Sequence, residues 1–183
     1  MMLKSIVKEI LEIVVILVIA MIIVIPIRFF LFSPFIVRGA SMEPTFSDTD
    51  YLIVEKVTSE FKRGDVIVIN RDGTNFLKRI IGLPGETIKI NQGNVYIIKN
   101  NQTYLLSEDF IKEKVKENMQ KAIIREDEFF VMGDNRNNSF DSRRWGAITK
   151  DQVSGVVLLR LFPFNEIEFF NFVEPFKVLQ LSN

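Results

Sequence analysis

The longest hydrophobic stretch of the chain lies near its N-terminus. Residues 13–27 contain no polar side chain, and residues 10–32 contain two charged ones, Glu12 and Arg28. A helix needs about 20 mostly apolar residues to cross a bilayer. The pattern therefore predicts one transmembrane helix over residues 10–32. A cleaved secretory signal or a buried core helix is the alternative, but the apolar character continues past the central run and no polar face interrupts it.

From residue 33 onward the pattern changes to short apolar runs separated by turn residues. The turns include Arg63-Gly64, Asp72-Gly73 and Leu83-Pro84-Gly85. Many short strands at such spacing predict a mainly β protein, antiparallel and barrel-like. The expected strands are Tyr51–Lys56, Asp65–Asn70, Asn75–Ile81, Glu86–Asn91, Asn94–Ile98, Phe129–Met132 and Ser154–Leu161.

One segment follows a helical rather than a strand period. Within Ser107–Lys121, apolar residues recur every fourth position at Ile111, Val115 and Met119, and Ser107 suits an N-cap. The pattern predicts an exposed amphipathic helix here.

The chain ends in an aromatic segment that is too short and too charged to span a bilayer. Core packing and contact with a membrane surface both account for such a segment. Its phenylalanines are Phe162, Phe164, Phe169, Phe170, Phe172 and Phe176.

Composition restricts the possible chemistry. Lys+Arg and Asp+Glu both number 23, so the balanced charge gives no indication of a nucleic-acid partner. The chain has no cysteine, which excludes disulfides and thiolate metal sites. It also has no histidine, which excludes Ser-His catalysis and the usual zinc hydrolase sites. Any general base must be Lys, Asp, Glu or Tyr.

A candidate nucleophile lies just after the apolar run, in Gly39-Ala40-Ser41-Met42-Glu43-Pro44-Thr45. Small neighbours allow another backbone to approach the Ser41 hydroxyl, and Pro44 restricts the local conformation. Taken alone, the same heptapeptide is also compatible with an ordinary surface turn.

A candidate base lies in the expected strand Asn75–Ile81. Alternation places Lys78 on one face with Phe76 and Ile80. A desolvated lysine loses its preference for the charged form, and the neutral amine can accept a proton. A lysine that extends from a half-buried strand into solvent is the alternative.

A third polar stretch covers residues 133–143. It does not match a calcium-binding EF-hand loop, because Arg136 and Ser139 occupy positions that need Asp or Asn and Gly. The stretch is either a solvated loop or a rigid, ion-paired wall that holds a hydroxyl near Lys78.

Four stretches occur together in the order of one known family. They are Ser41-Met42-x-Pro44-Thr45, Arg63-Gly64-Asp65-Val66-Ile67, Leu77-Lys78-Arg79-Ile80-Ile81-Gly82-Leu83-Pro84-Gly85-Glu86 and Gly133-Asp134-Asn135-Arg136-x-Asn138-Ser139-x-Asp141-Ser142-Arg143. Together with the preceding anchor they resemble the bacterial type I signal peptidases, most closely the Gram-positive members.

The resemblance implies a membrane-bound serine endopeptidase that uses a Ser-Lys dyad and neither a metal nor a cofactor. Ser41 would attack the scissile carbonyl, with Lys78 as its general base. The same amine would then activate the water that hydrolyses the acyl-enzyme, and the backbone N–H of Ser41 would hold the oxyanion.

Supporting roles follow from the same resemblance. Some relatives carry a serine at the position of Gly39, where its hydroxyl is a second oxyanion donor. Here a backbone N–H or a water would replace it, or the oxyanion hole would have one donor fewer. The other matched residues are Ser139, which would orient the lysine, the ion pairs of Arg79 with Asp134 and Asp141 with Arg143, and the substrate-pocket residues Phe35, Val37 and Leu77.

The resemblance also implies a domain layout. Residues 1–9 would form a cytoplasmic tail, 10–32 the anchor and 33–183 an extracytoplasmic catalytic domain, with a smaller β-rich insertion at about 86–125. The expected partners are the lipid bilayer and the signal peptides of preproteins, with small residues such as Ala-x-Ala before the cut.

Two other classes of function stay open at this point. One is a membrane-tethered β domain that binds partners, in which Ser41 and Lys78 are incidental. The other is a self-cleaving Ser-Lys regulator, which would need a DNA-binding domain where this sequence has an apolar anchor.

Overall fold

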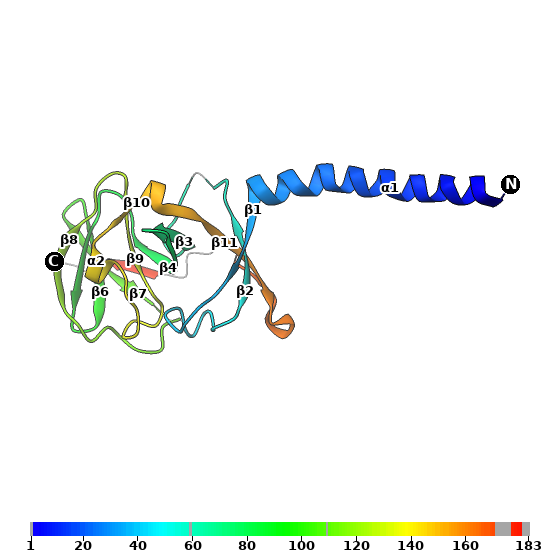
Figure 1. The fold of residues 1–183 in the computed structure, drawn as a ribbon. Helices are drawn as coiled ribbons and strands as arrows, with labels where there is room; N and C mark the ends of the chain where they lie inside the picture. The colour runs from blue at the N-terminus through cyan, green and yellow to red at the C-terminus, as the bar shows by residue number, and fades with distance from the viewer. Residues whose placement is uncertain (1, 59, 109, 171–176, 181–183) are drawn as a thin grey trace.

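The N-terminal helix projects from a β-rich body as a single rod (Figure 1). The computed structural model describes residues 2–58, 60–108, 110–170 and 177–180. Helix α1 (Met2–Pro26) is followed by the short π-helix η1 (Ile27–Leu31). Residues Ile6–Pro26 are long and apolar enough to cross a membrane, and none of them is buried in the protein. An apolar helix without a protein partner is typical of a membrane span.

The larger of two antiparallel sheets has eight strands in the order β1-β2-β11-β3-β4-β9-β10, with β12 paired to β11. Strand β1 begins directly after η1, so the helix leads into an outer strand of this sheet (Figure 1). The bounds are β1 (Phe32–Ile36), β2 (Tyr51–Glu55), β3 (Val66–Arg71), β4 (Thr74–Gly82), β9 (Glu128–Met132), β10 (Ile148–Thr149), β11 (Val153–Phe162) and β12 (Glu168–Phe169).

The second sheet has five strands in the order β13-β7-β6-β5-β8. Its strands are β5 (Thr87–Asn91), β6 (Asn94–Lys99), β7 (Gln102–Ser107), β8 (Met119–Ile123) and β13 (Lys177–Gln180). Three short helices complete the fold: α2 (Ser142–Trp145), η2 (Lys150–Gln152) and η3 (Phe164–Glu166).

The predicted mainly β, antiparallel fold is confirmed. All seven expected strands form, with ends that differ by at most two residues; for example, Ser154–Leu161 corresponds to β11. The sheet does not close into a barrel among the described residues, because β1 and β10 lie at opposite ends of its order. The pattern did not predict β1, because its five residues continue the aromatic end of the membrane-like run.

The predicted helix over Ser107–Lys121 is wrong. This segment ends strand β7, crosses irregular chain and begins strand β8. Contacts with distant residues replace the helical hydrogen bonds: Asn137 bonds to the Lys114 carbonyl and to the Lys116 N–H. Val115 is buried in the core of the second sheet, so the four-residue spacing reflects separate contacts rather than one helix face.

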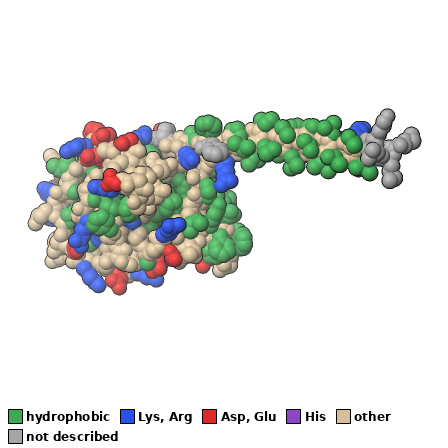
Figure 2. Space-filling view, viewed as in Figure 1, with side chains coloured by type: hydrophobic (Ala, Val, Ile, Leu, Met, Phe, Trp, Pro, Cys, Tyr) green, Lys and Arg blue, Asp and Glu red, His purple; other side chains and the backbone are tan. Residues whose placement is uncertain are grey.

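The C-terminal phenylalanines divide into two groups. Phe170 packs on Phe46 of the core, with ring centroids 4.7 Å apart. Phe162, Phe164 and Phe169 are exposed, and apolar side chains gather where the β-rich body meets α1 (Figure 2). Phe172 and Phe176 lie outside the described residues.

Candidate active site

The loop that carries Ser41 is held by the core on both sides. Met42 and Phe46 are fully buried in a cluster with Val37 and Leu77. Gly39 adopts φ +80°, a conformation that favours glycine, and its N–H donates to Asp48 Oδ1 at 2.7 Å. Because apolar anchors flank it, the half-buried Ser41 keeps a fixed position at the edge of the core.

Lys78 lies in the middle of β4 and is 2% exposed. Its Nζ donates to Ser41 Oγ at 2.8 Å and to the Leu77 carbonyl at 2.8 Å. No carboxylate forms an ion pair with this amine among the described residues. The structure therefore brings the two predicted dyad residues together from segments 37 positions apart.

Burial lowers the pKa of the Lys78 amine to about 8, because an ammonium loses its hydration in this cleft. The negative charges of Asp141 and Asp134 oppose this effect, and the positive charge of Arg143 adds to it. With this pKa, roughly one amine in ten is neutral at pH 7. A neutral amine in hydrogen-bond contact with a hydroxyl can accept its proton.

A bidentate ion pair lies behind the amine. Arg79 Nε and Nη2 donate to the two Asp134 oxygens at 2.8 and 2.6 Å, and both residues are buried. Thr45 Oγ1 also donates to Asp134 at 2.6 Å, and Arg79 Nη1 donates to the Gly64 carbonyl. The network ties the Ser41 loop to β4, because Thr45 belongs to that loop.

A second ion pair fixes the polar stretch 133–143. Arg143 Nε and Nη2 donate to the Asp141 carboxylate at 2.8 and 2.7 Å. Asp141 is fully buried and also accepts from the Gly133 N–H at 3.0 Å. The ion pair and this backbone hydrogen bond therefore hold the ends of the stretch in place, while Asn137, Asn138 and Phe140 are exposed.

Ser139 differs from the expectation. Its hydroxyl is buried and has no hydrogen-bond partner among the described residues, so the implied bond to Lys78 is not formed here. The Lys78 amine bonds to Ser41 and Leu77 instead. The Ser139 side chain packs on Gly133, which also touches the Ser41 carbonyl, and any Cβ at Gly133 would collide with both.

Asn135 is a site residue whose role the sequence did not indicate. Its backbone N–H donates to the Ser41 carbonyl at 3.1 Å, and its side-chain amide donates to the Ala40 carbonyl at 2.9 Å. Asn135 therefore fixes the two peptide units that flank Ser41, one before and one after its Cα. The residue lay within the quoted motif, but only the folded loop shows which carbonyls it reaches.

An open cleft of about 710 Å³ leads away from the dyad. We call it the catalytic cleft; Phe35, Val37 and Leu77 line it together with Ser41 and Lys78. Val37 and Leu77 are buried and Phe35 is partly buried, so the floor of the cleft is apolar. In the part of the chain that the structure describes, no three acidic side chains come together as a metal site.

A serine hydrogen-bonded to a desolvated amine, in a cleft of a β protein without histidine, is an arrangement that suits a serine peptidase. The chain belongs to the family described as Signal peptidase, peptidase S26, whose profile matches residues 10–162. The protein is thus a signal peptidase I, an enzyme that removes signal peptides, and its N-terminal apolar helix is consistent with the membrane anchor of this family.

Two Bacillus relatives agree with this assignment. The chain is 40% identical over 163 residues to Signal peptidase I of Bacillus amyloliquefaciens, covering 82% of this chain and 86% of the relative. It is 38% identical over 180 residues to Signal peptidase I S of Bacillus subtilis, covering 87% and 93%. A crystal structure of a signal peptidase I from Enterococcus faecalis matches with 32% identity and a TM-score of 0.47, covering 54% of this chain and 97% of that one.

Proposed function

We propose that Ser41 and Lys78 are the catalytic dyad of this signal peptidase. The neutral Lys78 amine accepts the Ser41 proton while Oγ attacks the scissile carbonyl. The ammonium then gives that proton to the leaving amine, which leaves the signal peptide attached to Ser41 as an ester. The same amine removes a proton from water, and hydrolysis of the ester restores the enzyme.

The observation that carries this proposal is the 2.8 Å contact between Ser41 Oγ and a lysine nitrogen that is 2% exposed. Ordinary lysines are charged and solvated, and such a lysine would not act as a base at neutral pH. Arg79 with Asp134, and Asp141 with Arg143, act as supports that keep both walls of the cleft in place.

The oxyanion is held by the backbone N–H of Ser41, together with a second donor supplied by solvent. The N–H of Gly39 is already bonded to Asp48, so this group does not serve as that donor. No atom lies within 4 Å of the place where a Gly39 side chain would begin, which leaves room for a water.

Cleavage of a purified preprotein by the full-length chain in detergent tests the dyad. Ser41→Ala and Lys78→Ala should each lower kcat by about 10⁴-fold or more, as the loss of a nucleophile or its base does elsewhere. Ser154→Ala and Lys121→Ala are matched controls on exposed strand positions and should cleave normally. Normal cleavage by either dyad variant would refute the assignment.

Substrate selection follows from the catalytic cleft. Phe35, Val37 and Leu77 form apolar walls that disfavour charged side chains before the cut, and the limited depth of such pockets disfavours bulky ones. The substrates are therefore preproteins with small residues, such as Ala-x-Ala, at the end of the signal peptide.

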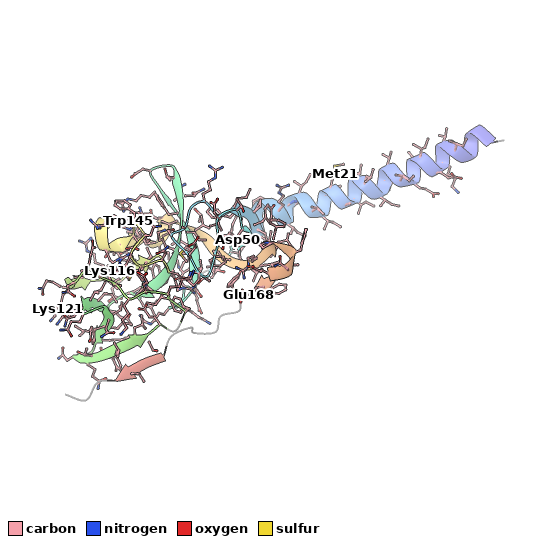
Figure 3. The ribbon with its side chains drawn as sticks, turned by 90° about the horizontal axis from the view of Figure 1, so that it is seen from below. Met21, Asp50, Lys116, Lys121, Trp145 and Glu168 are labelled. Carbon is pink, nitrogen blue, oxygen red and sulfur yellow. The ribbon has the colours of Figure 1, made fainter. Side chains whose placement is uncertain are left out.

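We further propose that residues 10–32 cross the bilayer, residues 1–9 lie in the cytoplasm and residues 33–183 lie outside, with an insertion at about 86–125 that supplies strands β5 to β8 of the second sheet. The segment that follows β11 carries the exposed Phe164 and Phe169 and lies at the α1 end of the body (orange in Figure 1), which supports a position close to the lipid. Figure 3 shows which residues lie near α1: Asp50 and Glu168 are at the α1 end of the body, and Lys121 is at the far end.

The absence of native cysteine makes this orientation simple to test. In intact cells, a membrane-impermeant maleimide should label Ser154→Cys and should leave Ser5→Cys unlabelled until the membrane is opened. Labelling of Ser5→Cys alone in intact cells would reverse the proposed orientation.

A further inference from the structure

A second groove lies where α1 meets the larger sheet, with a volume of about 300 Å³. We call it the anchor groove; its walls are Val24, Ile27 and Arg28 from the helical end and Phe32, Tyr51 and Ile53 from the strands. The three helical residues are spaced i, i+3 and i+4, so they form one face of the helix. Val24 and Ile27 are 58% and 42% exposed, which leaves this apolar face without a protein partner among the described residues.

The anchor groove adjoins the catalytic cleft. Pro34 and Tyr51 line both of them. Strand β1 forms the connection, because Phe32 at its start lines the anchor groove and Ile36 at its end lines the catalytic cleft. β1 pairs with β2 on one side and is the outer strand of the order, so no strand among the described residues pairs with its other edge.

We propose that the anchor groove binds the end of the hydrophobic region of the signal peptide, immediately upstream of the segment held in the catalytic cleft. A signal peptide carries 7–15 apolar residues before its cleavage site. With α1 in the bilayer, those residues enter the catalytic cleft from the lipid side, and the shared walls at Pro34 and Tyr51 lead from one site to the other. This inference rests on the proposed function.

The chemistry of the groove fits an apolar helical segment better than a polar peptide. Six of the eight lining residues are Val, Ile, Phe, Pro or Tyr, and the other two are Ser33 and Arg28. The aliphatic stem of Arg28 can line the groove while its charge reaches the headgroup level. Packing between apolar helices in lipid depends on shape, so a larger side chain in the groove should exclude the substrate.

The test compares two substitutions in the full-length chain, reconstituted in vesicles of phosphatidylethanolamine and phosphatidylglycerol. Val24→Trp fills the anchor groove with an apolar side chain that the bilayer tolerates. Ile22→Trp is the matched control, because Ile22 is 66% exposed against 58% for Val24, does not line the groove and lies about 200° around the helix from Val24.

Two substrates are used with each variant: a complete preprotein and a short peptide that begins at the Ala-x-Ala segment. Val24→Trp should lower kcat/KM for the preprotein by about tenfold, because the larger side chain excludes the apolar segment from the groove, and should leave the short peptide unaffected. Ile22→Trp should cleave both substrates normally.

Three results would overturn the proposal: normal cleavage of the preprotein by Val24→Trp, an equal loss on both substrates, or the same loss with Ile22→Trp. An equal loss on both substrates would mean that the change disturbs the catalytic cleft or a lipid bound in the groove. Failure of the unsubstituted chain to cleave either substrate would instead refute the proposed function, so the two failures are distinct.

A photoreactive side chain placed at residue 24 or 22 gives a readout that does not depend on turnover. In the Ser41→Ala chain, which retains substrate, position 24 should cross-link to the hydrophobic region of the signal peptide and position 22 should not. Cross-links from position 24 to phospholipid alone would identify the groove as a lipid site and overturn the proposal.

Discussion

Two neighbouring basic residues of β4, Lys78 and Arg79, are both buried but differ in their hydrogen-bond partners. Arg79 has a bidentate carboxylate partner, Asp134, and two further hydrogen-bond contacts. Lys78 has a hydroxyl and a carbonyl, and no carboxylate within ion-pair distance among the described residues. Burial with a partner keeps a cation charged and makes it structural, whereas burial without one lowers the pKa of a lysine and makes it a base.

Removal of the partner from the structural cation should have the largest effect. Asp134→Ala leaves the Arg79 guanidinium buried without a counter-ion, so the free energy of unfolding should fall by roughly 3–5 kcal/mol. Glu117→Ala is the control, because its pair with Arg144 is more than half exposed on both sides and should change stability by about 1 kcal/mol or less. Thermal unfolding in detergent measures both, and equal losses would contradict the comparison.

The pH dependence of cleavage tests the functional cation. The pKa of Lys78 is lowered to about 8, so the amine is protonated below this pH and neutral above it. Cleavage should therefore rise with pH up to about 8 and fall below it, by about fivefold from pH 8 to pH 7 and about fiftyfold from pH 8 to pH 6. A kcat/KM profile that is flat from pH 6 to pH 9 would exclude lysine as the base.

Removal of the functional cation should stabilise the fold. Lys78→Met replaces a desolvated amine by an apolar side chain of similar length, and the free energy of unfolding at pH 7 should rise by roughly 1–3 kcal/mol while cleavage is lost. The destabilisation of the fold by the buried ammonium is complete below about pH 8, and it disappears as pH rises toward the ordinary lysine pKa of 10.5. The difference between the two chains should therefore shrink at high pH; a less stable variant at pH 7 would contradict this account.

The sequence was sufficient for features that depend on local pattern or on motif order. Alternation predicted β4, and the motif order placed Ser41 and Lys78 in one proposed site, which the fold brings within 2.8 Å. Features set by distant partners were not predictable in this way. The segment 107–121 is irregular because Glu108 pairs with the fully buried Arg136 and Asn137 binds the backbone of Lys114.

The details of the loop around Ser41 also depend on tertiary contacts. Asn135 reaches two carbonyls beside the nucleophile from 95 positions away, and no local pattern in the sequence indicates that contact. Ser139 shows the converse: its motif position is matched, yet its hydroxyl packs on Gly133 without a bond to Lys78. Motifs identified the participants, and only the fold determined their contacts.

Helix α1 leads through the five π-helical residues of η1 directly into β1, so the distance between the helix end and the catalytic cleft is fixed. With α1 in the bilayer as proposed, the five residues of β1 span roughly 16 Å, and this rigid strand sets how far from the lipid a peptide bond must lie to meet Ser41. A membrane protein would escape cleavage if the peptide bonds that follow its apolar helix lie nearer to the lipid than Ser41 or farther from it, even where small residues precede those bonds. Substrate selectivity would then depend on the distance of the scissile peptide bond from the membrane surface as much as on the size of the side chains before it.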